Sequence, residues 1–137
     1  MTLPQPTTSF NVQPIGFITS RLTDLKDCPL QESENAPEAY LEFYTPYIEG
    51  AKDIAVGDKL IILTWLHIAD RNVLKCHKRN LVGSKEFGVF STRSPDRPNP
   101  IGLHTVTVLE IVNKQKIKIF PIEALNETPV IDIKPFI

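Results

Sequence analysis

Long apolar runs are missing from this chain of 137 residues. No stretch approaches the roughly 18 to 20 consecutive apolar residues of a membrane-spanning helix, so we expect no membrane partner. The first residues, MTLPQPTTSFNVQP, also lack the basic and apolar segments of a signal peptide. We therefore expect a cytoplasmic protein whose residues 1–11 form a flexible lead-in.

Cysteine and histidine are scarce, with two and three residues respectively. Cys28 and Cys76 share no metal-binding spacing and are too few for a disulfide framework, so free thiols are expected. His67, His77 and His104 are scattered along the chain. These residues predict no metal site.

An excess of charge is missing too, because the formal net charge is −1. The sequence therefore has no overall nucleic-acid signature. The charges are nevertheless uneven: residues 24–58 hold nine acids against two bases, and residues 71–97 hold seven bases against two acids. If the second segment forms one face, that face would attract phosphates.

The apolar runs that are present are short and rich in β-branched residues, which favours strands over helices. With few helices in a chain of this length, they predict one domain over residues 1–137, a small antiparallel β-barrel of about six or seven strands. Closure into a barrel would remove the exposed edges of such apolar strands. The expected strands are Val12–Ile18, Tyr40–Tyr44, Lys59–Ile68, Phe87–Thr92, Leu103–Val112, Ile117–Ile122 and Val130–Ile133.

Three local patterns refine this expectation. The nearly continuous apolar run KLIILTWLHI, residues 59–68, predicts a central strand, and the interruption at residues 113–115 predicts a hairpin. The one helical candidate is Glu32–Tyr40, which contains Pro37.

The segment GVFSTRSPDRPNPIGL, residues 88–103, contains three prolines and two arginines. Each proline fixes its own φ and restricts the residue before it, so residues 94–100 are expected to be a rigid connector outside any sheet. Arg93 and Arg97 carry planar guanidinium groups suited to carboxylate or phosphate. Two explanations stay open from these residues alone: a stiff corner whose arginines pair with surface acids, or an anion-binding loop.

This segment resembles the signature G-V-F-[AS]-T-R-S-x-x-R-P-N-P-I-G of the TsaA/TrmO family of S-adenosylmethionine-dependent tRNA (adenine-N6)-methyltransferases. EALNETPVIDIKPF (residues 123–136) is similar to that family's D-x-x-D-G-T-P-V-x-D-I-K-P-Y, and TWLHIADR (residues 64–71) to W-x-H-x-A-D-R of its shorter members. PIGFITS (residues 14–20) resembles the family's first strand, and Pro29-Leu30-Gln31 lies where it has P-R-Q. The matches span residues 14–136 in the family's order.

The resemblance implies a small β-barrel that binds S-adenosylmethionine at a homodimer interface and methylates N6 of threonylcarbamoyladenosine beside the tRNA anticodon. The cofactor needs a hydrogen-bond acceptor for its adenine amino group, a cation for its carboxylate and a neutral or anionic environment for its sulfonium. Transferred position by position, the cofactor contacts are Pro29, Leu30, Gln31, His67, Ile68, Arg93, Leu103, Phe120, Pro121, Ile122 and Glu123.

Substrate contacts are expected on the basic segment and near the C-terminus. Methyl transfer depends mainly on an in-line approach, and the threonylcarbamoyl group acidifies the N6–H, so little demand falls on a catalytic base. Asn99 and Asp132 are candidates for orienting N6. The expected substrate-binding residues are Lys75, Lys78, Arg79, Arg97 and Lys134.

Several of these residues have a purely structural alternative. Glu123 could instead pair with Lys116 or Lys118, and Asp132 could form a salt bridge with Lys134 that fixes the last strand. His67 could be a histidine satisfied at a strand end, and Gln31 a solvated loop residue. His77 and His104 have no informative spacing, so both are interpreted as structural or surface residues.

The sequence also departs from the family pattern. Leu30 stands in place of an arginine, and Asn126-Glu127 replaces Asp-Gly, so a turn loses a glycine suited to positive φ. Longer members continue beyond the position of Ile137 into a C-terminal domain implicated in tRNA binding. Two alternatives therefore stay open: a methyltransferase acting on a small metabolite, and a non-catalytic barrel that binds RNA or the cofactor.

Overall fold

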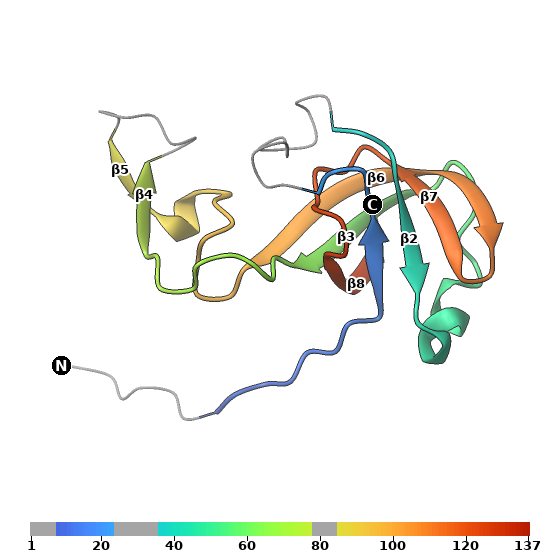
Figure 1. The fold of residues 1–137 in the computed structure, drawn as a ribbon, viewed down its shortest axis with the longest axis horizontal. Helices are drawn as coiled ribbons and strands as arrows, with labels where there is room; N and C mark the ends of the chain where they lie inside the picture. Colours follow the sequence, from blue (N-terminus) through green and yellow to red (C-terminus); the bar gives the residue numbers. More distant parts are fainter. Residues whose placement is uncertain (1–7, 24–35, 78–84) are drawn as a thin grey trace.

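The computed structural model describes residues 8–23, 36–77 and 85–137. Within them the chain forms eight strands and two 3-10 helices (Figure 1). The elements are β1 (Gly16–Thr19), β2 (Ala39–Phe43), η2 (Thr45–Ala51), β3 (Lys59–Trp65), β4 (Lys75–His77), β5 (Glu86–Gly88), η4 (Val89–Ser91), β6 (Ile101–Asn113), β7 (Lys116–Phe120) and β8 (Pro129–Pro135).

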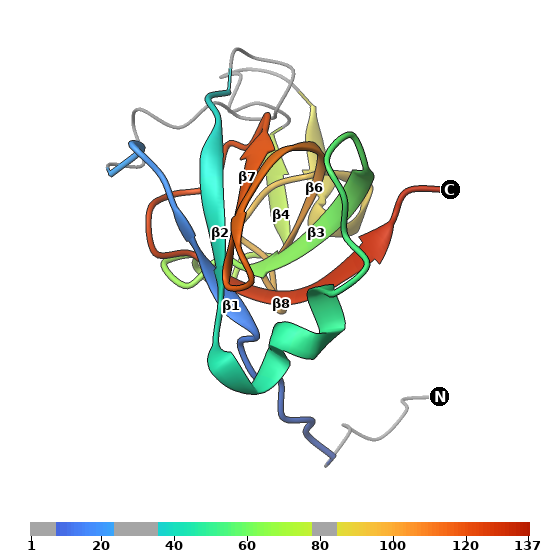
Figure 2. The same cartoon turned by 90° about the vertical axis from the view of Figure 1, so that its right-hand side faces the viewer.

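Six of the strands form a closed antiparallel barrel in the order β1-β2-β7-β6-β3-β8, which confirms the expected fold (Figure 2). β3 lies between β6 and β8, as its apolar sequence predicted for a central strand. β6 and β7 form the expected hairpin, with Lys114 and Gln115 in the turn. Closure leaves none of these six strands with a free edge along its whole length.

The barrel interior is the hydrophobic core, and it is filled by every second residue of the strands. Leu60 and Ile62 of β3 and Val106 and Val108 of β6 are at most 5% exposed, whereas the residues between them are more accessible. β6 shifts register between Val108 and Glu110, and Glu110 is exposed. A packed interior leaves the barrel's ends and outer face as places for a site.

A lobe formed by β4, β5 and η4 projects from one end of the barrel, where β3 ends and β6 begins (Figure 1). A single strand had been expected over Phe87–Thr92. That expectation is wrong beyond Gly88, because the chain turns into η4 at Val89. The three-residue strand β4 was not expected; its sequence, KCH, is too short for an alternating pattern.

The opposite end of the barrel is covered by η2, which had not been expected. Pro46 in its first turn is compatible with a helix start, because the missing N–H would be unpaired there anyway. Ile48, Ala51 and Ile54 pack against the core from this end. The expected helix Glu32–Tyr40 is wrong over its described part, because Ala39 and Tyr40 begin β2.

The turn before β8 keeps the shape that a glycine would favour, although it carries a glutamate. Glu127 has a φ of 70°, in the left-handed region. Its N–H donates to the carbonyl of Ile18, and the Oδ1 atom of Asn126 accepts from the N–H of Ser20. Thr128 Oγ1 donates to the carbonyl of Leu125 at 2.6 Å. These bonds hold Glu127 in a conformation that its side chain disfavours.

Candidate functional site

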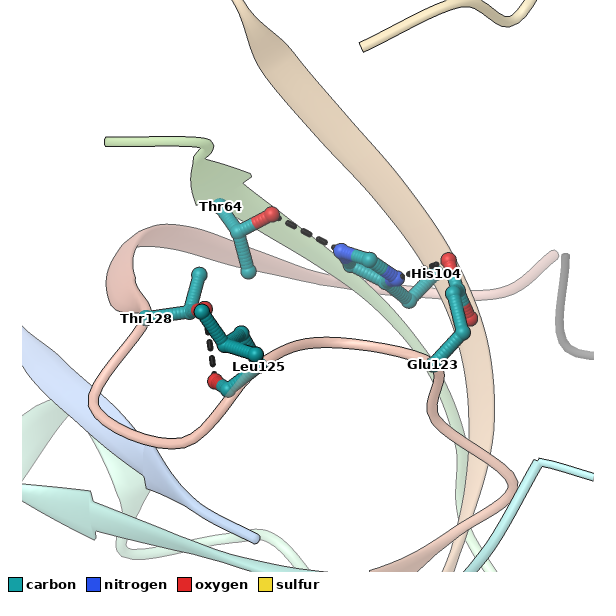
Figure 3. A network of polar contacts seen from close by, with 5 residues as sticks. All are labelled: Thr64, His104, Glu123, Leu125 and Thr128. Atoms are coloured by element: carbon teal, nitrogen blue, oxygen red, sulfur yellow. Dashed lines mark hydrogen bonds and ion pairs between the residues drawn. The ribbon is translucent and has the colours of Figure 1, made fainter. Parts of the chain in front are cut away.

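A chain of three polar side chains, Thr64, His104 and Glu123, connects β3, β6 and the segment after β7 (Figure 3). Thr64 lies near the end of β3 and His104 near the start of β6, so the chain is at the end of the barrel that carries the lobe. His104 is 2% exposed and uses both ring nitrogens. Its Nε2 lies 2.8 Å from Thr64 Oγ1, and its Nδ1 lies 2.5 Å from Glu123 Oε1. Glu123 Oε2 is buried and has no hydrogen-bond partner among the described residues. A buried carboxylate oxygen without a donor is costly, so it marks a position where a ligand can supply one.

The strand order explains why these residues meet. β7 runs antiparallel to β6 and ends at Phe120, after which the chain continues along the first half of β6 and brings Glu123 to His104. Thr64 pairs in register with Gly102, two residues before His104 on the same face of β6. A Cβ on Gly102 would lie within 3.0 Å of both Thr64 Oγ1 and His104 Nε2. Glycine is therefore required for the contact between threonine and histidine.

Glu123 does not take the lysine partners considered from the sequence. Lys118 pairs with Glu38 instead, at 3.2 Å, and the hydrogen bond and charge of Glu38 raise the pKa of the lysine. Lys116 lies over the ring of Tyr40, 4.6 Å from its centroid. Among the described residues, the partner of the Glu123 carboxylate is therefore His104 and not a lysine.

The predicted cofactor contacts at Leu103 and Phe120 lie on the outer face of the barrel. Leu103 is 41% exposed and pairs directly with Leu63; Phe120 is 44% exposed and pairs with Thr107. Ile122, by contrast, is fully buried in the core, and its N–H donates to the carbonyl of Pro37. Only its backbone is therefore placed to contact a ligand without opening the core. Pro121, between them, is half-buried.

Two loops beside these residues are joined by polar contacts. Arg71, from the loop after β3, donates from Nε to the carbonyl of Pro98 at 2.6 Å and from Nη2 to Asn99 Oδ1 at 3.1 Å. Asp96 accepts from the N–H of Asp70 at 2.8 Å. The guanidinium of Arg71 also stacks on Trp65, 5.1 Å from the ring centroid. The proline-rich connector is therefore fixed to the loop that follows β3.

Arg97 holds the connector from within. Its guanidinium donates to three backbone carbonyls, those of Ser94 at 2.7 Å, Val89 at 2.9 Å and Thr92 at 2.5 Å. The expected position of the connector (residues 94–100) outside the sheet is confirmed, because residues 92–100 contain no strand. Contact of Arg97 with a substrate stays a prediction. The guanidinium would have to break its hydrogen bonds to these carbonyls, or bind the substrate while keeping them.

Arg93, on the same connector, is exposed and makes no hydrogen bond or ion pair with a described residue. His67 and Ile68 are also exposed, in the turn after β3. That turn is tied to the connector, because the N–H of Leu66 donates to the carbonyl of Pro100. These side chains are free to bind a ligand at the same end of the barrel as Glu123.

The other predicted substrate residues are more dispersed. Lys134 and Asp132 form a salt bridge at 3.0 Å on the exposed face of β8. This is the structural alternative to a substrate role that the sequence had left open. Lys75 is exposed on β4 in the lobe. Asn99 is exposed, with its Oδ1 taken by Arg71. Pro29, Leu30, Gln31, Lys78 and Arg79 lie outside the described residues.

Sequence reasoning missed Thr64, His104 and Arg71 as members of the site. His104 alternates in phase with Val106 and Val108, which are buried core residues. An inward histidine on an apolar strand face needs polar partners, and that phase was the signal available. Its partner Glu123, 19 positions further on, could not be identified by spacing.

Neither a membrane span nor a metal cluster is found in the part of the chain that the structure describes. None of its helices has the length and apolar character required to cross a bilayer. It also contains no cluster of three or more His, Cys, Asp or Glu residues able to hold a metal ion.

Comparison with known proteins identifies relatives along nearly the whole chain. The model of the tRNA-methyltransferase O N-terminal domain matches residues 17–137. A probable S-adenosyl-L-methionine-binding protein of Methanothermobacter thermautotrophicus is 35% identical over 91% of this chain and 88% of its own length. Another, from Methanocaldococcus jannaschii, is 43% identical over 75% of this chain and 84% of its own length.

Solved structures with a similar fold also come from the TrmO proteins. A crystal structure of TrmO from Pseudomonas aeruginosa superposes with a TM-score of 0.74 and 28% sequence identity, covering 96% of this chain. The match covers 56% of that longer chain, so this chain spans just over half of its solved relative. On the agreement of sequence, motif order and barrel topology, the chain belongs to the family of the tRNA-methyltransferase O N-terminal domain.

Proposed function

We propose that this protein is an S-adenosylmethionine-dependent methyltransferase that methylates N6 of threonylcarbamoyladenosine beside the anticodon of tRNA. The observation that carries the cofactor part is the buried Oε2 atom of Glu123 at the lobe end of the barrel, for which the described residues provide no hydrogen-bond donor. Exposed Arg93 and the turn with His67 and Ile68 lie at the same end. The relatives named as S-adenosyl-L-methionine-binding proteins support this choice of ligand.

The groups at this end fit the cofactor. S-adenosylmethionine supplies a methyl group activated on a cationic sulfonium. A carboxylate such as Glu123 can accept hydrogen bonds from the cofactor's hydroxyl or amino groups, and a guanidinium such as Arg93 can bind its carboxylate. The exposed apolar side chains of Leu103 and Phe120 offer contact surface to its uncharged parts.

The acceptor is proposed from the family and from the basic lobe. Three exposed basic residues face no described acid within ion-pair distance: Lys75 at the start of β4, Lys85 just before β5, and Arg93. Such a surface suits a phosphate backbone, and the structural relatives are TrmO proteins. The connector's rigidity serves the transfer, because donor and acceptor must be held in line.

We also propose a homodimer, because the site as built from one chain is open. Leu103 and Phe120 lie on a convex outer surface, so a cofactor that contacts them needs a second surface to cover it. The outer face of β3 and β6 is apolar at its lobe end, with the register pairs Leu63–Leu103 and Trp65–Ile101. The ion pair Asp132–Lys134 borders it on β8. An apolar patch with a charged rim is typical of a protein interface.

Calorimetric titration of the full chain with S-adenosylmethionine tests the cofactor. The wild type is expected to bind, and Arg93→Ala to weaken binding by about tenfold or more, as for loss of a charged hydrogen-bonded pair. Lys114→Ala, in the turn at the far end of β6, is the control and is expected to bind as the wild type does. Unchanged affinity in Arg93→Ala would remove that residue from the site.

Nucleoside mass spectrometry of tRNA from a strain lacking the gene tests the acceptor. We expect the methylated threonylcarbamoyladenosine to be lost and to return on expression of the wild-type protein. If its level is unchanged while the protein binds the cofactor, the acceptor is a different molecule, such as a small metabolite. If transfer to no acceptor occurs, the barrel is a binding module.

A further inference from the structure

His104 is a deeply buried polar residue of the site, and its imidazole contacts two different segments of the chain. Thr64 binds one ring nitrogen at 2.8 Å and Glu123 the other at 2.5 Å. A ring held at both nitrogens cannot rotate without breaking a buried hydrogen bond. His104 therefore fixes the position of the Glu123 carboxylate that it binds.

Glu123 differs from Thr64 in having acceptor capacity left over. Its side chain is 15% exposed, so it lies near the surface, yet Oε2 itself is buried without a donor among the described residues. Within the described part of the chain, the carboxylate thus has one oxygen that the protein anchors and one that accepts no hydrogen bond. An arrangement of this kind suits a ligand that brings its own N–H or O–H group.

We propose that His104 is a positioning residue for the cofactor: it anchors Oε1 of Glu123 so that Oε2 accepts a hydrogen bond from a hydroxyl or amino group of S-adenosylmethionine. Thr64 completes the alignment by fixing the far side of the ring, and Gly102 leaves the space for it. This inference rests on the proposed function for the identity of the ligand. It adds a role for a histidine that itself contacts no ligand.

A purely structural pair would give a different result. In that case His104 and Glu123 only tie residues 120–124 to β6, and substitution would lower stability without acting on the ligand through Glu123. The two roles separate in a pair of substitutions. The amide nitrogen of an asparagine is the same number of bonds from Cα as Nδ1 of histidine, which contacts Glu123. The amide nitrogen of a glutamine is the same number of bonds from Cα as Nε2 of histidine, which contacts Thr64.

His104→Asn therefore keeps a donor for Glu123, and His104→Gln keeps only the contact with Thr64. Calorimetry with S-adenosylmethionine is expected to show an affinity within about threefold of wild type for His104→Asn and about tenfold weaker for His104→Gln, the effect of one hydrogen bond to a charged group. Thermal unfolding without ligand should give similar losses for both variants. Equal affinities of the two variants, in folded protein, would overturn the proposal.

A double-mutant cycle with Glu123→Gln gives the second readout. If His104 acts through Glu123, Glu123→Gln weakens binding by about tenfold and adding His104→Gln weakens it no further. Effects that multiply would overturn the proposal and leave the cofactor site intact. Failure of the wild type itself to bind S-adenosylmethionine would overturn both this inference and the proposed function, so the two failures are distinguishable.

Discussion

Glu127 shows how a single residue can carry strain that the sequence alone suggested. Its φ of 70° is a conformation that glycine adopts freely and that costs other residues about 1–2 kcal/mol. We expect Glu127→Gly to raise the free energy of unfolding by about 1 kcal/mol, because relief of the strain outweighs the extra freedom of the unfolded chain. Thermal and urea unfolding measure this.

Glu127→Ala is the matched control for that variant. It removes the carboxylate but keeps the Cβ that disfavours positive φ, so no gain in stability is expected. A gain of similar size in both variants would assign the effect to the charge of the side chain. The backbone explanation would then be wrong.

Gly102 packs against the contact between Thr64 and His104. A substitution at Gly102 tests whether that contact depends on close packing. A Cβ there would meet Thr64 Oγ1 and His104 Nε2 at less than 3.0 Å, and both atoms are buried. We expect Gly102→Ala to lower the free energy of unfolding by about 1–3 kcal/mol, the usual cost of overpacking. Gly88→Ala is the control, because a Cβ added at Gly88 would meet no atom of the described residues within 4 Å apart from its chain neighbours, and little change is expected.

Denaturant titration compares the two glycine variants, and cofactor titration follows on the folded protein. Equal stability of Gly102→Ala and wild type would show that β3 and β6 can separate locally at little cost. The contact between Thr64 and His104 would then not be a fixed part of the site.

At the scale of elements, the connector is held by an arginine that the sequence assigned to substrate. Arg97 donates to the carbonyls of Ser94, Val89 and Thr92, a geometry that a lysine cannot reproduce. Arg97→Lys is therefore expected to speed hydrogen exchange of connector amides, including that of Thr92, by about tenfold through local opening. Amides of β3 serve as the internal reference and should be unaffected.

The same variant tests the substrate role. If Arg97→Lys weakens tRNA binding while exchange in the connector is unchanged, Arg97 contacts the substrate as the sequence suggested. If exchange rises and tRNA binding falls together, the arginine acts by holding the loop. Filter binding at two salt concentrations provides the tRNA measurement.

The elements also show what the sequence could predict. The β-branched apolar run Leu103–Val112 predicted the strand that forms most of β6, and the prolines predicted the connector. The η4 helix within an apolar run could not be foreseen, since Val89–Ser91 has strand-like composition and its turn is set by tertiary contacts such as that of Arg97 with Val89. The pairing of His104 with Glu123 depends on the path that the chain takes after the end of β7, which no local sequence pattern encodes.

At the scale of the whole molecule, the barrel's outer face determines whether the site is complete. Inward residues of β3 and β6 form the core, yet near the lobe their outward residues are also apolar: Ile61, Leu63 and Trp65 on β3, and Ile101 and Leu103 on β6. A strand apolar on both sides is expected when both sides are covered. In one chain the outer side is only partly covered, because Ile101 and Leu103 are more than 40% exposed.

Leu103→Glu tests this face as a dimer interface. A carboxylate at the centre of an apolar interface would be buried without a partner, so we expect the substitution to weaken dimerisation by at least about tenfold. Sedimentation velocity over a range of concentrations should show a dimer for the wild type and a monomer for the variant. Val56→Glu is the control, since Val56 is 62% exposed in the turn before β3. A wild type that stays monomeric at all concentrations would contradict the dimer and would require the cofactor to bind on one open chain.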